Sequence, residues 1–241
     1  MRKVYILACA ALFIPLTVSA MTNKEALDLF SKALFGNQAA LASLKSAAQA
    51  GDANAESRLG SYYRVKHHYK QGLVWLEKAT AQNNASAEYN LGVAYYFGHG
   101  VPRDYAKADY WFRKSADQGD DEAEYNLGVA YYKGQGVPRD YAKAYYWTQK
   151  AADQGGDEAE YTLGVAYYKG QGVPRDYAKA YYWYRKSADQ GNADAELNLG
   201  VAYYKGQGVP QNSMLALHWL KKAAAQGSQT AQKDIHIIER G

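Results

Sequence analysis

The sequence predicts an all-α fold, a right-handed α-solenoid of stacked antiparallel helix pairs. Glycine, proline and tryptophan each recur with a period of 36 residues. Residues 122–157 and 158–193 differ at only six positions, which indicates duplication. The periodic residues are Gly92, Gly128, Gly164 and Gly200; Pro102, Pro138, Pro174 and Pro210; and Trp75, Trp111, Trp147, Trp183 and Trp219.

This period predicts the organisation of the chain into repeats. Gly60 precedes Trp75 by 15 positions, whereas Gly92 precedes Trp111 by 19, so one repeat lacks four residues of its loop. The predicted segments are a signal peptide (1–20), a degenerate helix pair (21–53), a shortened repeat (54–85), four full repeats (86–121, 122–157, 158–193 and 194–229) and a closing helix (230–241).

Each full repeat is predicted to contain two helices, at about 85–97 and 104–117 in the first copy. Asp104 is placed to cap the start of the second helix, and Gly119 to end it in a left-handed conformation. Pro102 cannot continue the first helix and favours an extended turn. Capping residues recur in the other copies at Asp140, Asp176 and Asn212.

The first helix of a repeat has two apolar faces. Ala87 and Leu91 share one face, while Tyr89, Val93 and Tyr96 lie nearly opposite, so this helix is sandwiched or lines a groove. A glycine in mid-helix costs about 1 kcal/mol relative to alanine. We therefore expect each periodic glycine to allow close approach of a tryptophan or tyrosine from a neighbouring helix.

The first twenty residues have the pattern of a secretory signal peptide. Arg2 and Lys3 precede an apolar stretch over residues 4–16, and Val18-Ser19-Ala20 forms a small-residue cleavage site. We favour cleavage over a retained anchor, and over a lipoprotein acylated at Cys9, because that cysteine follows Lys3 too closely. The expected location is the periplasm, with secretion as the alternative.

Removal of this leader leaves no cysteine, and 26 basic against 24 acidic residues. Stability must then come from packing without disulfides, and thiol catalysis is excluded. A net charge of +2 is too small to indicate a nucleic-acid or anionic-membrane partner. We expect a monomer without stable membrane insertion.

The repeated motif resembles the Sel-1-like repeat. It reads Leu127-Gly128-x-x-Tyr131, then Gly134-x-Gly136-Val137, then Asp140-x-x-Lys143-Ala144-x-x-Trp147-x-x-Lys150-Ala151-Ala152-x-x-Gly155. Its Leu-Gly-x-x-Tyr core is shared with tetratricopeptide repeats, but the period and the loop favour the Sel-1-like subclass. The resemblance covers nearly all of the chain after the leader and implies stacked helix pairs whose first helices line a concave surface.

Members of that family are mostly adaptors in protein assembly, and bacterial members are often exported. The resemblance places a protein-binding face on the first helices, with an aromatic row edged by lysines. Its residues are Tyr89, Val93, Tyr96, Tyr125, Val129, Tyr132, Lys133, Tyr161, Val165, Tyr168, Lys169, Leu197, Val201, Tyr204 and Lys205. The alternative is that these tyrosines only pack against neighbouring repeats.

Other chemistry is disfavoured by spacing. The Gly134-x-Gly136 loop lacks the preceding strand and the spacing of a phosphate-binding loop. Arg139, Asp140 and Lys143 recur in several copies, which is atypical of an active site. The five histidines have no metal-ligand spacing. Relatives that act on β-lactams are cysteine-rich, and this chain has neither those cysteines nor a Ser-x-x-Lys motif. No catalytic, metal or cofactor residue is predicted.

The sequence therefore predicts an exported, non-catalytic protein that binds a protein or peptide through its concave Tyr/Val/Lys face. A periplasmic immunity or inhibitor protein against a toxin and a secreted host-interaction factor remain alternatives. A cell-wall or β-lactam hydrolase is disfavoured.

Overall fold

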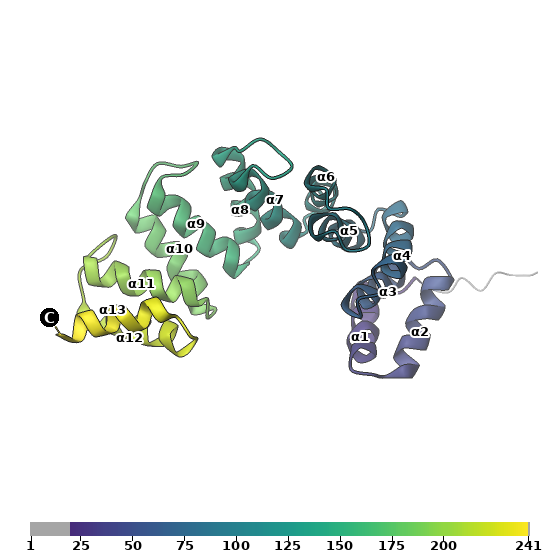
Figure 1. Cartoon of the computed structure of the whole chain (residues 1–241), viewed down its shortest axis with the longest axis horizontal. Helices are drawn as coiled ribbons and strands as arrows, with labels where there is room; N and C mark the ends of the chain where they lie inside the picture. The colour runs from purple at the N-terminus through teal and green to yellow at the C-terminus, as the bar shows by residue number, and fades with distance from the viewer. Residues whose placement is uncertain (1–19, 241) are drawn as a thin grey trace, which may run out of the picture.

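The computed structural model describes residues 20–240. These residues form thirteen helices and no strand, arranged along an elongated arch (Figure 1), which confirms the all-α solenoid. The first helices of the pairs are α1 (Asn23–Leu34), α3 (Ala53–Val65), α5 (Ala85–Phe97), α7 (Asp121–Lys133), α9 (Asp157–Lys169) and α11 (Ala193–Lys205). The second helices are α2 (Gln38–Gln49), α4 (Tyr69–Ala81), α6 (Tyr105–Ala116), α8 (Tyr141–Asp153), α10 (Tyr177–Asp189) and α12 (Ser213–Ala225), and α13 (Gln229–Arg240) follows.

Each second helix of a full repeat begins at a side-chain cap. In α8 the Asp140 carboxylate accepts a hydrogen bond of 3.0 Å from the backbone N–H of Lys143. Asp140 itself has an extended backbone, so its side chain satisfies a donor that the first turn leaves free. The capping predictions at Asp104, Asp176 and Asn212 are confirmed by the same bond.

The loop between the helices of a repeat packs on the preceding repeat. Gly134 ends α7 with φ +69°, and Gly136 follows with φ +75°. A Cβ atom on Gly136 would overlap the backbone carbonyl of Tyr105, so only glycine allows this approach. The backbone N–H of Asp140 closes the loop with a 3.0 Å hydrogen bond to the carbonyl of Tyr131. The interpretation of the loop as a helix-to-helix turn is therefore confirmed.

The shortened repeat has a tighter connection. Only residues 66–68 separate α3 from α4, and His67 adopts φ +60° to make the turn. A left-handed conformation is unusual for a residue other than glycine. The missing loop therefore leaves this repeat without the contact that Gly136 makes in a full repeat.

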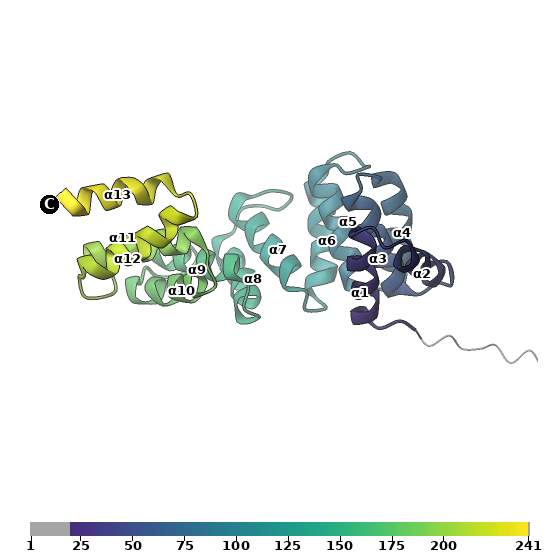
Figure 2. The same cartoon turned by 90° about the horizontal axis from the view of Figure 1, so that it is seen from below.

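The stack is built from helices that touch on two sides. Each first helix after α1 packs on the second helix of its own pair and on the second helix of the preceding pair, and the row of pairs is seen edge-on in Figure 2. The layers between them are filled mainly by alanine and leucine, such as Ala123 and Leu127 on α7 and Ala144 on α8. Small side chains at these positions let the helices approach closely.

The mid-helix glycines do allow close helix packing, but not against tryptophan. A Cβ atom on Gly128 would overlap the side chain of Thr148, and one on Gly164 would overlap the ring of Tyr184. Phe112, Leu76 and Leu220 take this position in the other repeats. The expected tryptophan or tyrosine partner is therefore confirmed only at Gly164, where Tyr184 takes this position. It is wrong at the other glycines; in α8, for example, Thr148 and not the adjacent Trp147 faces Gly128.

Trp147 belongs instead to a repeated polar network. The Glu124 carboxylate is only 1% exposed and lies 2.6 Å from the ammonium group of Lys150, which also sits 4.9 Å from the centre of the Trp147 ring. Gln154 donates hydrogen bonds to Glu124 at 3.0 Å and to the carbonyl of Gly119 in the preceding repeat at 3.1 Å. The ion pair recurs as Lys186 with Glu160 at 2.8 Å and Lys222 with Glu196 at 2.9 Å.

Within residues 20–240, no helix is long and apolar enough to cross a lipid bilayer. Residues 1–19 of the predicted signal peptide (1–20), which include Cys9, lie outside the residues that the structure describes.

Candidate protein-binding groove

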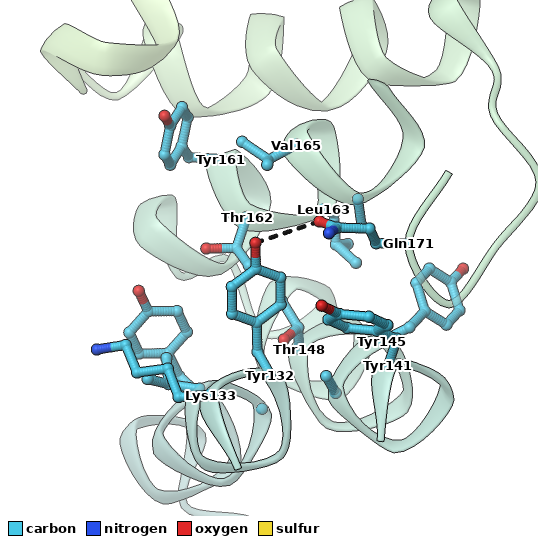
Figure 3. A pocket seen from close by; sticks show the side chains of 15 residues that line it. Tyr132, Lys133, Tyr141, Tyr145, Thr148, Tyr161, Thr162, Leu163, Val165 and Gln171 are labelled. Atoms are coloured by element: carbon cyan, nitrogen blue, oxygen red, sulfur yellow. Dashed lines mark hydrogen bonds between the residues drawn. The ribbon is translucent and has the colours of Figure 1, made fainter. Parts of the chain in front are cut away.

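A cavity of about 280 Å³ lies between the first helices of two successive repeats, α7 and α9 (Figure 3). Its floor comes from α8, where Ala144 and Thr148 reach it between the two first helices. Six residues of the predicted protein-binding face line this cavity: Tyr125, Val129, Tyr132, Lys133, Tyr161 and Val165. The structure therefore brings the predicted residues of two repeats around one hollow.

Tyr132 both lines the cavity and joins two repeats. Its hydroxyl group donates a hydrogen bond of 3.2 Å to Oε1 of Gln171 in the next repeat (Figure 3). Tyr96 makes the same bond to Gln135 at 3.3 Å. The tyrosines of this row therefore contribute to packing between repeats and to the surface of the groove.

Burial affects the ionisation of two phenols that line this cavity. Burial raises the pKa of Tyr125 and of Tyr161 above the ordinary value for tyrosine. Lys133 is exposed at the end of α7, so the cavity combines aromatic walls with a cationic rim. Aromatic area with a polar tip is typical of binding hot spots.

The predicted residues of the first full repeat are less accessible. Val93 is only 9% exposed and packs in the core, so it does not contribute to the surface of the groove. Tyr89 is half-buried, and its ring centre lies 5.8 Å from that of Phe112. These two side chains are less accessible because Phe112 fills the space beside them.

The predicted residues of the last two repeats are more open. Tyr168 is 36% and Tyr204 38% exposed, and Lys169 and Lys205 are exposed beside them. Tyr168 and Val201 border a small hollow of about 80 Å³, while Leu197 is half-buried and packs on the α12–α13 core. Val201, Tyr204 and Lys205 border a further hollow of about 240 Å³ against α13.

A charged hollow of about 330 Å³ lies on the first helices nearer the N-terminus, and sequence reasoning missed it. Its lining includes Arg58 and Arg64 of α3, Tyr89 of α5 and Asp120. Burial raises the pKa of Asp120 to about 6. Aligning the shortened repeat on its glycine would have shown that Arg64 replaces the tyrosine found at Tyr96 in the next repeat.

A second aromatic row runs along the second helices and was also missed. Tyr110, Tyr146 and Tyr182 are each more than half exposed. Each of these rings stands edge-on to the tryptophan that follows it, with ring centres 5.1 Å apart for Tyr146 and Trp147. The 36-residue period of these tyrosines was visible, but their exposure depends on packing. Among residues 20–240, no group of histidine, cysteine and acidic side chains is placed to hold a metal ion.

Solved structures resemble this fold over most of the chain. The c5321 protein of Escherichia coli, described as a protective antigen with an SLR fold, is 36% identical with a TM-score of 0.81, and the match covers 90% of this chain and 49% of that one. A Sel1 repeat protein from Oxalobacter formigenes is 34% identical with a TM-score of 0.74, covering 81% and 58%. A Sel1 repeat protein from Klebsiella pneumoniae is 25% identical with a TM-score of 0.53, covering 82% and 98%. This chain thus spans about half the length of the E. coli protein, and no curated protein sequence matches it.

Stacked helix pairs with a hollow first-helix surface define an α-solenoid repeat protein, a class that generally mediates protein–protein interactions on a mostly non-catalytic scaffold. The Sel1 repeat model matches residues 53–84, 85–120, 121–156, 157–192 and 193–228. The chain therefore belongs to the Sel1 repeat family, as its motif indicated.

Proposed function

We propose that this protein is an exported, non-catalytic binding protein that holds a protein or peptide on the first-helix face of its arch. The observation that supports this most strongly is the cavity between α7 and α9, because six predicted residues from two repeats converge on it. Repetition supplies one row of contacts per repeat, which suits an extended partner.

The chemistry of this face supports binding of a polypeptide. Half-buried tyrosines such as Tyr125 and Tyr161 offer apolar area that loses little conformational entropy on binding. The exposed lysines, Lys133, Lys169 and Lys205, follow the same edge and would favour a partner with acidic side chains.

Peptides selected from a random library on the purified protein provide the test. We expect Tyr168→Ala with Tyr204→Ala to weaken binding of the selected peptides at least about tenfold, because both side chains are exposed on the first-helix face. A matched control removes two tyrosines from the second helices, Tyr146→Ala with Tyr182→Ala, and should leave binding unchanged. Loss of binding only in the control pair would assign the binding face to the second helices and contradict the proposal.

A secreted host-interaction factor is the second candidate. It is supported by the similarity to the E. coli protein described as a protective antigen, since an antigen must be accessible to the host. Fractionation of the producing cells separates the candidates. Recovery of the protein from the culture medium supports the host-interaction factor. Retention of the protein in the periplasm supports binding to a partner inside the cell envelope.

A further inference from the structure

One position on the second helices faces the mid-helix glycine of its own repeat, and its residue changes from repeat to repeat. The side chain there packs directly on the glycine of the first helix. From the N-terminal side, the residues at this position are Leu76, Phe112, Thr148, Tyr184 and Leu220. Only Thr148 is small, although residues 122–157 and 158–193 are otherwise nearly identical.

The volume of the cavity depends on the size of the side chain at this position. The cavity above Thr148 measures about 280 Å³, and the equivalent hollow one repeat later, with Tyr184, measures about 80 Å³. Corresponding residues line both, including Tyr132 and Tyr168. The larger cavity is therefore the space that a ring occupies in the next repeat.

Three repeats carry a first-helix tyrosine beside this space, and among the described residues only that of the repeat with Thr148 has no ring partner on its second helix. The ring of Tyr89 lies 5.8 Å from that of Phe112, and the ring of Tyr161 lies 5.9 Å from that of Tyr184, both in a tilted arrangement. Tyr125 faces Thr148 at the same place. A ring entering the cavity would complete for Tyr125 the aromatic pair that both neighbours form within the chain.

We propose that this cavity receives a phenylalanine side chain of the partner, next to an acidic residue. The proposal deepens the function proposed above and depends on it. A cavity of about 150 Å³ lined by apolar groups accepts benzene, so the space suffices for a phenyl ring.

Hydrogen bonding inside the cavity favours an apolar ring. The Tyr132 hydroxyl is bonded to Gln171, and the Tyr145 hydroxyl to Gln149 at 2.9 Å and to Tyr167 at 3.0 Å. These two hydroxyl groups are already engaged within the chain, so a polar group entering beside them would lose water and gain little from them, whereas a phenyl ring needs no hydrogen-bond partner.

Charge at the rim indicates the neighbour of that phenylalanine. Lys133 is exposed and lies at the edge of the cavity. Among the described residues, its ammonium group forms no ion pair with a carboxylate. An aspartate or glutamate beside the inserted ring could approach this ammonium group. The recognised element is therefore an acidic segment with one phenylalanine.

Three short peptides test the proposal on the purified protein by titration followed by amide NMR shifts. They are acetyl-Glu-Phe-Glu-amide, acetyl-Glu-Leu-Glu-amide and acetyl-Lys-Phe-Lys-amide. We expect saturable shifts at residues 125–133 and 161–166 with the first peptide, and binding at least about tenfold weaker with the other two. Equal binding of all three, or no saturable binding, would overturn the proposal.

The chain supplies its own matched variants. Thr148→Tyr copies the next repeat, fills the cavity and should weaken binding of acetyl-Glu-Phe-Glu-amide at least about tenfold. Tyr184→Thr should open a second site, with new shifts at residues 161–169 and 197–202. If Thr148→Tyr does not fold, the second site in Tyr184→Thr still decides. Unchanged binding in a folded Thr148→Tyr variant, or no second site, contradicts the proposal.

The library-selected peptides separate the two proposals. If they lose affinity in the Tyr168→Ala/Tyr204→Ala variant but not in Thr148→Tyr, the groove binds a partner and only the phenylalanine site is wrong. If they are insensitive to both variants, both proposals fail.

Discussion

The ammonium group of Lys150 lies 2.6 Å from the carboxylate of Glu124, a side chain that is almost fully buried between α7 and α8. The pair is held in place by Gln154 and by stacking of the lysine on Trp147. Because the same ion pair recurs in all four full repeats, it joins the two helices of each of them at one repeated point.

Lys150→Met should therefore destabilise the protein by about 2–3 kcal/mol, because it leaves the buried Glu124 carboxylate without its counter-charge. Lys143→Met is the matched control. Lys143 lies 3.6 Å from Asp140 in an exposed pair, so its loss should cost less than about 1 kcal/mol. Chemical denaturation of the two variants measures the difference, and equal losses would show that the buried pair adds nothing.

Gly128→Ala should lower the melting temperature. The added Cβ atom would overlap the Thr148 side chain, and the cost of about 1–3 kcal/mol for overpacking exceeds the gain in helix propensity. Gly156 has an ordinary φ of −67°, and a Cβ atom there would meet only atoms at ordinary van der Waals distance, so Gly156→Ala should cost less than Gly128→Ala, through a poorer residue at the N-cap of α9 alone. A higher melting temperature for Gly128→Ala would mean that Thr148 turns aside at no cost.

Asp109→Asn should stabilise the protein at pH 8 and have little effect at pH 4. Burial raises the pKa of Asp109 to about 7, although Arg113 on the same helix lowers it in part. The folded state thus retains a proton that the unfolded chain releases near its ordinary pKa, so stability falls as the pH rises from about 4 to 7. Melting curves across this range check the effect, with Asp117→Asn, at an exposed aspartate, as the control. A gain independent of pH would contradict this origin.

Thr148→Phe should raise stability by about 0.5–2 kcal/mol, because the ring fills a cavity that Phe112 and Tyr184 fill in their own repeats. Thermal melting of the variant measures the gain. A lower melting temperature would mean that the space above Thr148 is too small or too wet for a ring.

The local features of the fold could be predicted well from the sequence. Asp140 before a helical pattern, and two glycines around a short loop, define a cap and a turn through interactions within a few residues. The helices predicted over about 85–97 and 104–117 are found at Ala85–Phe97 and Tyr105–Ala116 for this reason.

The candidate site was predicted only in part. The face holding Tyr125, Tyr132 and Tyr161 follows from helix periodicity, and these residues do line one cavity. The charged hollow at Arg58 and Arg64 escaped notice because it joins residues of four helices, α1, α3, α5 and the start of α7, that are distant in the sequence.

The sequence by itself determined the stack of helix pairs, since a strict period, caps and turns are encoded within each repeat. Only the tertiary structure decided that Thr148 faces Gly128 and opens a cavity toward α9. Threonine is an ordinary residue in a helix. Whether its small side chain leaves a cavity depends on the space between three helices from two repeats. That space is set by how whole repeats pack, which no local pattern specifies.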